Sequence, residues 1–276
     1  MMRKLLALLP LLVTAGGADA KCGPNPDMCE TDMGAYHISL PESGGKDAPV
    51  LVFLHGYGGN GKGTMGNRRL VTPMMNRGWA VIAPDGLRRD GDGPKSWNFF
   101  PGRTGRDETA FLKEVVADAA ARFGTSVQNV MLSGFSAGGF MVSYLACEAP
   151  ETFAAYAPVS GGFWRPHPQT CAGPVKLLHT HGWRDTTVPI EGRKLRGGMY
   201  QQGDIFAGLE IWRAANGCSD EKPSKFSETG EFWRRSWSDC STDSALELAM
   251  WPGGHTLPGG WSDMAIDWFE SVTGQQ

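Results

Sequence analysis

The sequence predicts an α/β fold in which helices cover both faces of a mostly parallel β-sheet. Three observations predict it. Short apolar segments alternate with segments of helical periodicity, glycine-rich loops follow several apolar segments, and no composition break, internal repeat or low-complexity linker divides the chain. Strands buried on both faces have unbroken apolar runs, and strands that alternate with helices pair in parallel. We therefore expect one folded domain.

The first part of the chain supplies the expected start of the sheet. Residues 36–40 form a first short strand, and residues 49–54 (PVLVFL) are continuously apolar and rich in β-branched side chains. That run ends at residues 55–61, a glycine-rich loop that neither a helix nor a strand would tolerate. Residues 79–83 (WAVIA) predict the next buried strand.

A loop and a helix follow these strands. Residues 84–106 are dense in Gly, Arg and Asp and predict a loop, whereas residues 107–123 have apolar side chains on one helical face. Asp107 and Glu108 suit the positive N-terminal end of that helix.

The second half continues the alternation of strands and helices. The expected strands are residues 130–133, 153–159, 175–179 and 245–251. The expected helices are residues 137–146, 205–215 and 261–272. The last of these is amphipathic, as expected for a helix that packs on one face of a sheet.

The beginning of the chain has the pattern of a signal peptide. Arg3 and Lys4 precede an apolar run over residues 5–13, and Ala18-Asp19-Ala20 matches an A-x-A cleavage site. The run is too short for a stable membrane-spanning helix. We expect residues 1–20 to be the signal peptide, residues 21–276 to be one domain, and the protein to be secreted or periplasmic without a membrane anchor.

Charge excludes two classes of partner. The formal net charge of the 276 residues is −3, and no long run of Lys or Arg is present. Nucleic acids and anionic membranes attract basic patches, so neither is expected as a partner.

The six cysteines predict disulfides. An even number of cysteines behind an export signal, without a C-x-x-C pair, favours disulfides over a metal or redox centre. The order along the chain suggests three local pairs but does not fix them. These pairs are Cys22–Cys29, Cys147–Cys171 and Cys218–Cys240.

The strongest chemical signal is the sequence Gly134-Phe135-Ser136-Ala137-Gly138, a G-x-S-x-G pattern. It lies between the expected strand 130–133 and the expected helix 137–146, which is the context that a nucleophile on a sharp strand-to-helix turn requires. The helix N-terminus would point amide hydrogens at an oxygen bound there. The alternative is an ordinary glycine-rich turn, but the context favours Ser136 as a nucleophile.

A serine nucleophile needs a base, and the base needs an orienting carboxylate. His255 lies in a glycine-flanked loop between the last expected strand and the last helix, which fits the chain order Ser, acid, His. Asp185 follows the strand 175–179 and is the expected acid, with Asp204 as the fallback. The alternatives are an exposed loop histidine and a surface-turn aspartate.

No metal or cofactor is expected. His179 and His181 could share one face of a strand, but no third ligand with a matching context is evident. Neither a phosphate-binding P-loop nor a dinucleotide-binding G-x-G-x-x-G sequence after a strand is present.

Acyl transfer also needs two amide hydrogens that face the developing oxyanion. The residue after the nucleophile, Ala137, is expected to supply one amide. The glycine-rich loop after an early strand is expected to supply the other, through Tyr57. The alternative is a glycine-rich loop that binds nothing.

Four motifs give the chain a resemblance to a known family. They are LHGYGGNG (54–61), GFSAGG (134–139), HTHGWRDTTVP (179–189) and WPGGHTLPGG (251–260). In this order, from about residue 36 to 269, they resemble the polyhydroxybutyrate depolymerase and feruloyl esterase group of secreted α/β-hydrolases. The resemblance implies an α/β-hydrolase fold over residues 21–276, a catalytic triad of Ser136, Asp185 and His255, and an oxyanion hole at Tyr57 and Ala137.

Two positions depart from the pattern of that group. Ser96 precedes Trp97 and Asn98 where many relatives carry Cys-Trp-Asn, and Tyr57 occupies a position where a cysteine is common. These departures leave the cysteine pairing and the shape of the acyl pocket open.

The resemblance implies a serine esterase but not one substrate. Candidates are a polysaccharide-linked phenolic or acetyl ester and a soluble hydroxyalkanoate oligomer, so the partner is a small or oligomeric ester. Trp97 and Trp183 fall in loops near the expected site and could stack on substrate. The alternatives are a serine peptidase and a non-catalytic binding protein on the same fold.

Overall fold

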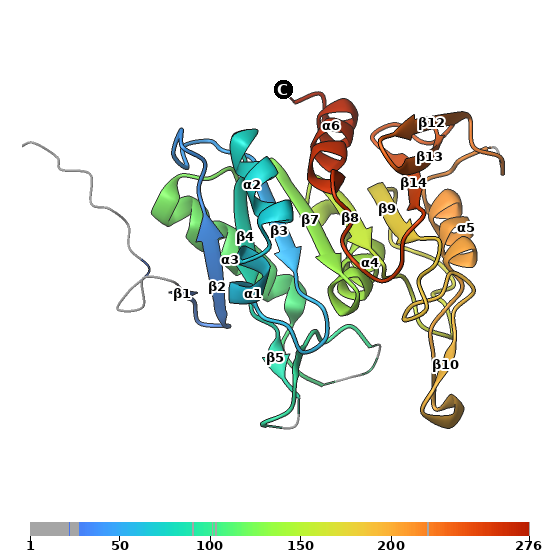
Figure 1. Ribbon diagram of the computed structural model, residues 1–276, viewed down its shortest axis with the longest axis horizontal. Helices are drawn as coiled ribbons and strands as arrows, with labels where there is room; N and C mark the ends of the chain where they lie inside the picture. Colours follow the sequence, from blue (N-terminus) through green and yellow to red (C-terminus); the bar gives the residue numbers. More distant parts are fainter. Residues whose placement is uncertain are drawn as a thin grey trace, which may run out of the picture.

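The chain is organised around one ten-stranded β-sheet with helices on both faces, as the computed structural model shows (Figure 1). The structure describes residues 22, 28–89, 91–100, 102, 104–219 and 221–275, so the expected signal peptide lies outside the described residues. The strand order is β1-β2-β4-β3-β7-β8-β9-β14-β13-β12. The strands are β1 (Cys29–Glu30), β2 (Ala35–Ser39), β3 (Val50–Leu54), β4 (Ala80–Pro84), β7 (Val130–Phe135), β8 (Ala155–Val159), β9 (Lys176–Gly182), β12 (Lys225–Thr229), β13 (Phe232–Trp237) and β14 (Ala245–Trp251).

The centre of the sheet is parallel, and its edges are antiparallel. All neighbouring pairs from β4 to β14 are parallel, whereas β1, β2, β12 and β13 pair antiparallel. The carboxyl ends of the parallel strands therefore meet at one edge, so the loops after β3, β7, β9 and β14 can build one site. The predicted mostly parallel sheet is confirmed.

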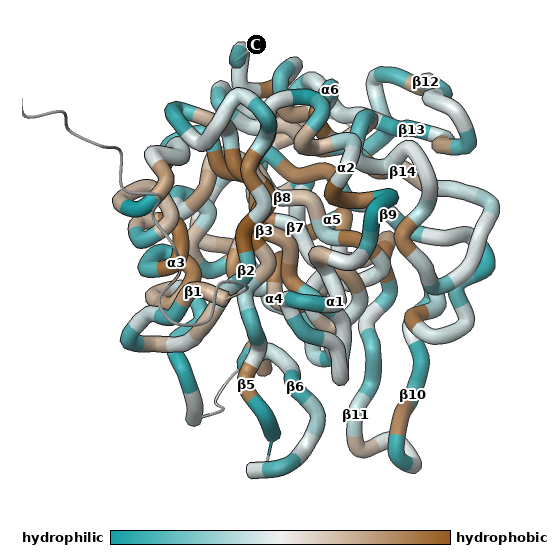
Figure 2. Tube along the Cα trace, turned by 60° about the vertical axis from the view of Figure 1, so that its left-hand side comes forward, coloured by the Kyte–Doolittle hydropathy of each residue, from teal (hydrophilic) through white to brown (hydrophobic). Residues whose placement is uncertain are grey.

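Two apolar cores lie on the two faces of the sheet. Helices α3, α4 and α5 pack on one face, and α2 and α6 pack on the other. Apolar segments follow the central strands in Figure 2. The helices are α1 (Gly61–Met65), α2 (Arg68–Asn76), α3 (Glu108–Phe123), α4 (Ala137–Glu148), α5 (Ile205–Ala215) and α6 (Trp261–Thr273). Within the described residues, no helix combines the length and the apolarity needed to cross a bilayer.

Two small hairpins project beyond the carboxyl edge of the sheet. One consists of β5 (Leu87–Arg88) and β6 (Lys95–Ser96), and the other of β10 (Lys194–Leu195) and β11 (Tyr200–Gln201). Both extend from the lower side of the molecule in Figures 1 and 2. We call them the β5–β6 hairpin and the β10–β11 hairpin.

Several elements were not predicted, and the clearest cases depart from the usual pattern of their class. Helix α2 contains Pro73, which normally disfavours a helix interior, yet its buried face packs against α6. Strands β12 and β13 lie at an edge and are mostly exposed, so they lack an apolar run. The β5–β6 hairpin lies inside the predicted loop 84–106 and has only two residues in each strand.

Three disulfides join the six cysteines in the local pairs that the chain order suggested. The bonds link Cys22 to Cys29, Cys147 to Cys171, and Cys218 to Cys240. The last bond closes the segment that contains the β12–β13 hairpin, between α5 and β14. It therefore restrains the strand that leads directly into the loop of His255.

We expect the double substitution Cys218→Ser/Cys240→Ser to lower thermal stability first and activity second. The two cysteines are 22 residues apart, and closing a loop of that length contributes roughly 3 kcal/mol in the chain-entropy account. Thermal unfolding and initial rates with p-nitrophenyl acetate measure the two losses, and peptide mapping of the wild type without reduction tests the Cys218–Cys240 link. A free thiol at either position, or a Cys218 link to Cys147 or Cys171, contradicts the assignment.

Candidate active site

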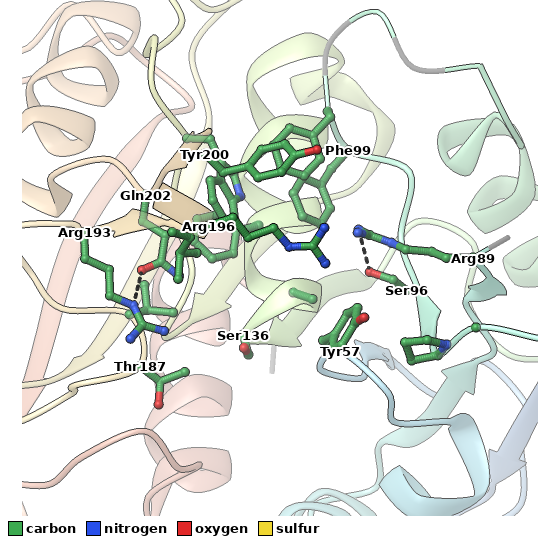
Figure 3. A pocket seen from close by; sticks show the side chains of 18 residues that line it. Tyr57, Arg89, Ser96, Phe99, Ser136, Thr187, Arg193, Arg196, Tyr200 and Gln202 are labelled. Carbon is green, nitrogen blue, oxygen red and sulfur yellow. Dashed lines mark hydrogen bonds between the residues drawn. The ribbon is translucent and has the colours of Figure 1, made fainter. Parts of the chain in front are cut away.

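Ser136 lies on a sharp turn between β7 and α4. Its backbone has φ 55° and ψ −114°, a conformation that non-glycine residues rarely adopt. A side chain at Gly138 would collide with the carbonyl oxygen of Leu54, so α4 can approach β3 only because position 138 is glycine. The turn places Ser136 at the wall of a cavity (Figure 3).

Ser136, His255 and Asp185 form one continuous row of hydrogen bonds. His255 Nε2 lies 2.9 Å from Ser136 Oγ, and His255 Nδ1 lies 2.7 Å from Asp185 Oδ2. A carboxylate can only accept hydrogen bonds, so His255 Nδ1 carries the hydrogen of this bond. Nε2 of the neutral ring then has no hydrogen and can accept a hydrogen bond from the serine hydroxyl. The structure therefore brings together the three residues that the sequence analysis selected.

Asp185 is held as a buried carboxylate. Burial by itself raises the pKa of this group, but hydrogen bonds from His255 and from the Val188 amide outweigh it, and the net pKa lies below the usual value. Its Oδ1 accepts from the amides of Thr187 and Val188 at 2.9 and 2.8 Å. The carboxylate thus stays charged at neutral pH and points its second oxygen at His255.

The loops that carry Asp185 and His255 are joined by backbone hydrogen bonds. Arg184 N donates to Gly253 O at 2.9 Å, and Trp183 N donates to Trp251 O at 2.8 Å. A side chain at Gly182 would collide with the Gly253 and Gly254 carbonyls, so glycine is required for this close approach. These contacts bring two residues that are 70 positions apart into hydrogen-bond distance.

A buried histidine pair supports the Asp185 turn. His181 Nε2 donates to the Val188 carbonyl at 2.8 Å, so its Nδ1 is the acceptor of a 3.1 Å hydrogen bond from His179 Nε2. Burial lowers the pKa of both rings, which are therefore neutral. Both nitrogens of His181 are thus engaged within the fold, and the pair holds the chain that donates to Asp185.

We expect the activity of this site to be independent of metal. Among the described residues, no three His, Cys, Asp or Glu side chains gather in a group that could hold an ion. Dialysis against EDTA should leave the turnover rate unchanged. A large loss that zinc restores would revive His179 and His181 as ligands.

The predicted oxyanion donors are the amides of Tyr57 and Ala137. Both residues line the cavity beside Ser136, and within the described chain neither amide has a hydrogen-bond acceptor, whereas the neighbouring Gly58 amide donates to Lys95 O. Ala137 is the first residue of α4, where amides have no acceptor within the helix. Tyr57 and Ala137 therefore stay the predicted pair of donors to an oxyanion.

His55 and Trp97 anchor the loop of Tyr57, a role that the sequence analysis missed. His55 Nδ1 donates to Gly56 O at 2.7 Å, and its Nε2 accepts from the Gly86 amide at 3.0 Å. Trp97 Nε1 donates to the His55 carbonyl at 2.8 Å, and the two rings pack with centroids 4.9 Å apart. The only signal in the sequence was the position of His55 at the start of the glycine-rich motif.

The cavity beside Ser136 has a volume of about 460 Å³, and aromatic side chains form part of its wall. Trp97 is 1% exposed and Trp183 is 59% exposed, and neither belongs to the lining. The prediction that these two rings contact substrate therefore gains no support from the cavity lining. The aromatic side chains that line the cavity are Tyr57, Phe99, Phe100, Phe140, Trp164 and Tyr200.

Comparison with known proteins places these features in a family. Residues 49–196 match the alpha/beta hydrolase fold family, which is more than half of the chain. The chain belongs to the alpha/beta hydrolase fold family. The matched part contains Ser136 and Asp185, and His255 lies beyond it.

The proteins that the chain resembles in sequence include esterases. A probable feruloyl esterase C of Aspergillus niger is 26% identical over 267 residues, which cover 91% of this chain and 88% of that protein. Poly(3-hydroxyalkanoate) depolymerase C of Paucimonas lemoignei is 28% identical over 192 residues, which cover 64% of this chain and 42% of that protein. The chain spans 21% of the length of another relative, a bifunctional acetylxylan esterase/xylanase of Neocallimastix patriciarum.

A solved structure has the same hydrolase fold. The acetyl xylan esterase from Aspergillus awamori matches with a TM-score of 0.64 and 18% identity, covering 85% of this chain and 93% of that chain. At this identity the likeness concerns the fold, and the predicted α/β-hydrolase architecture is confirmed.

Proposed function

We propose that this protein is a serine esterase that cleaves carboxylic esters through an acyl-enzyme on Ser136. The observation that carries the proposal is the hydrogen-bonded row Ser136–His255–Asp185 at the wall of the cavity. Relatives named as feruloyl esterase and hydroxyalkanoate depolymerase support this reaction class.

The proposed reaction has two steps, acylation of Ser136 and hydrolysis of the acyl-enzyme, and the same catalytic groups act in both. His255 Nε2 takes the proton of Ser136 as Oγ attacks the ester carbonyl carbon, and the resulting oxyanion accepts hydrogen bonds from the Tyr57 and Ala137 amides. The His255 imidazolium, stabilised by Asp185, then gives the proton to the leaving alcohol. Water activated by His255 next attacks the acyl-enzyme, which releases the acid and restores Ser136.

The size of the cavity favours a substrate whose acyl or alcohol group is larger than acetyl. Its volume of about 460 Å³ and its aromatic wall suit a phenolic acyl group, a sugar or a short hydroxyalkanoate chain. The proposed substrates are therefore polysaccharide-linked phenolic or acetyl esters and soluble hydroxyalkanoate oligomers. The three disulfides support a secreted or periplasmic location, where they are stable.

Two assays test this proposal. Purified protein should hydrolyse p-nitrophenyl acetate and leave a peptide p-nitroanilide intact, because the proposal is an esterase and not a peptidase. A panel of methyl ferulate, acetylated xylan and hydroxybutyrate oligomers then ranks the substrate classes by kcat/KM. Preference for the anilide would support a peptidase, and turnover of neither would support a non-catalytic binding protein.

A further inference from the structure

The cavity beside Ser136 is positively charged, although the whole chain is not. Its described lining contains three arginines, Arg89, Arg193 and Arg196, and no aspartate or glutamate. The formal net charge of the chain is −3. Arginine stays protonated at any physiological pH, so the lining attracts anions whatever the state of the catalytic residues.

The arginines reach the cavity from two opposite walls. Arg89 comes from the β5–β6 hairpin, and Arg193 and Arg196 come from the β10–β11 hairpin. Figure 3 shows the Arg196 side chain extending across the cavity toward the wall of Arg89, with Ser136 between the two walls. A ligand bound in the cavity beside Ser136 would therefore have guanidinium groups on both sides.

The contacts of two of these arginines leave their charge uncompensated. Arg193 Nε donates to the neutral amide oxygen of Gln202 at 3.3 Å, and within the described residues neither Arg193 nor Arg196 forms an ion pair. Both side chains are exposed, so their donors can turn toward a bound anion. Guanidinium groups bind carboxylates with two parallel hydrogen bonds.

The backbone at Arg196 gives a second, independent indication. Its φ is 48°, in the left-handed region, and it is followed by Gly197 and Gly198. A non-glycine residue is strained in that region, and glycine would avoid the strain. Strain of this kind is often retained where the side chain serves a ligand.

Charge and apolar surface lie together in the cavity. Phe99, Phe100, Phe140 and Trp164 form a continuous aromatic group in which neighbouring ring centroids are 4.9 to 5.8 Å apart. A neutral phenolic ester would use this surface alone, whereas an ester with a free carboxylate would also use the arginines. The second class of ligand would use both the arginines and the aromatic group.

We propose that the cavity selects esters that carry a free carboxylate, with Arg196 and Arg193 binding the carboxylate and the aromatic group holding the body of the substrate. This proposal rests on the proposed esterase function. Two kinds of ester carry such a carboxylate. A half-ester of a dicarboxylic acid has it on the acyl side, and a hydroxyacid oligomer has it on the alcohol side.

Matched substrate pairs test the proposal. Methyl hydrogen adipate and its neutral carboxamide, methyl adipamate, report the acyl side. The 3-hydroxybutyrate dimer and its primary amide report the alcohol side. For at least one pair, kcat/KM of the wild type should favour the carboxylate roughly five- to tenfold, the size of one charge-assisted contact. The preference should arise mainly in KM and shrink as ionic strength rises.

Substitutions then assign the preference to the arginines. Arg196→Gln should lower the carboxylate-to-carboxamide ratio, and Arg193→Gln/Arg196→Gln should lower it further, toward 1. The ratio cancels losses that affect both substrates of a pair. Arg69→Gln is the matched control, because Arg69 is an exposed arginine on α2 outside the cavity lining, and its ratio should equal that of the wild type.

The outcomes separate this inference from the proposed function. Ester turnover without a carboxylate preference in either pair, or a preference that the double variant keeps, overturns the inference alone. Absence of turnover on every ester, p-nitrophenyl acetate included, overturns the proposed function and the inference with it.

Discussion

Ser136→Ala should abolish ester turnover and leave the fold intact. Its hydroxyl lies 2.9 Å from His255 Nε2 on the turn before α4 and is the group that would form the acyl-enzyme. Losing the nucleophile of a triad costs on the order of 10⁴- to 10⁶-fold in kcat. Alanine keeps a Cβ at the same backbone position, so the thermal unfolding midpoint should change little. Initial rates with p-nitrophenyl acetate measure the loss.

Ser143→Ala is the matched control for this variant. Ser143 lies in the same helix, where its hydroxyl donates to the Gly139 carbonyl at 3.0 Å, away from the cavity lining. The same chemical change there should leave kcat close to that of the wild type. Equal losses in the two variants would mean that damage to α4, and not loss of a nucleophile, lowers the activity.

Asp185→Asn should lower kcat on the order of 10⁴-fold. An amide in this position can donate to His255 Nδ1, which then loses its hydrogen, so that Nε2 carries the hydrogen and cannot accept from Ser136. The neutral side chain also fails to stabilise the imidazolium. The loss should appear in kcat more than in KM, because Asp185 lies behind His255, away from the cavity lining.

Asp204→Asn provides the matched control for the acid. Asp204 caps the N-terminus of α5 and accepts a hydrogen bond from the Ala207 amide at 2.9 Å. Asparagine caps helices as well as aspartate does, so stability and kcat should both be preserved. If Asp204 were the acid of the triad, Asp204→Asn would lower kcat strongly and Asp185→Asn would not. Steady-state kinetics on both variants would reveal this.

The central strands and the triad could be predicted from the sequence because each has a local signature. Strands β3 and β4 are buried along their whole length and have unbroken apolar runs. Ser136 is framed by two glycines in a strand-to-helix context, and His255 and Asp185 follow strands whose carboxyl ends share one edge of the sheet. Short-range pattern and strand order together selected the residues that now lie in hydrogen-bond distance.

The cavity could not be predicted in the same way, because its residues come together only through tertiary contacts. Trp97 and Trp183 lie close to the motifs in sequence, but one is buried against His55 and the other faces solvent. Arg193 and Arg196 belong to a hairpin with two residues in each strand, which has no periodicity to detect. Their convergence on Ser136 depends on where the β10–β11 hairpin lies beside the sheet.

Covalent labelling tests the account most directly. A serine-directed fluorophosphonate should add one adduct per molecule to the wild type, and tandem mass spectrometry should place it on Ser136, with no adduct on the Ser136→Ala variant. Labelling should also be slow in Asp185→Asn, because His255 then no longer activates the hydroxyl. An adduct on another serine, or a wild type that remains unlabelled while it still hydrolyses p-nitrophenyl acetate, would contradict the account.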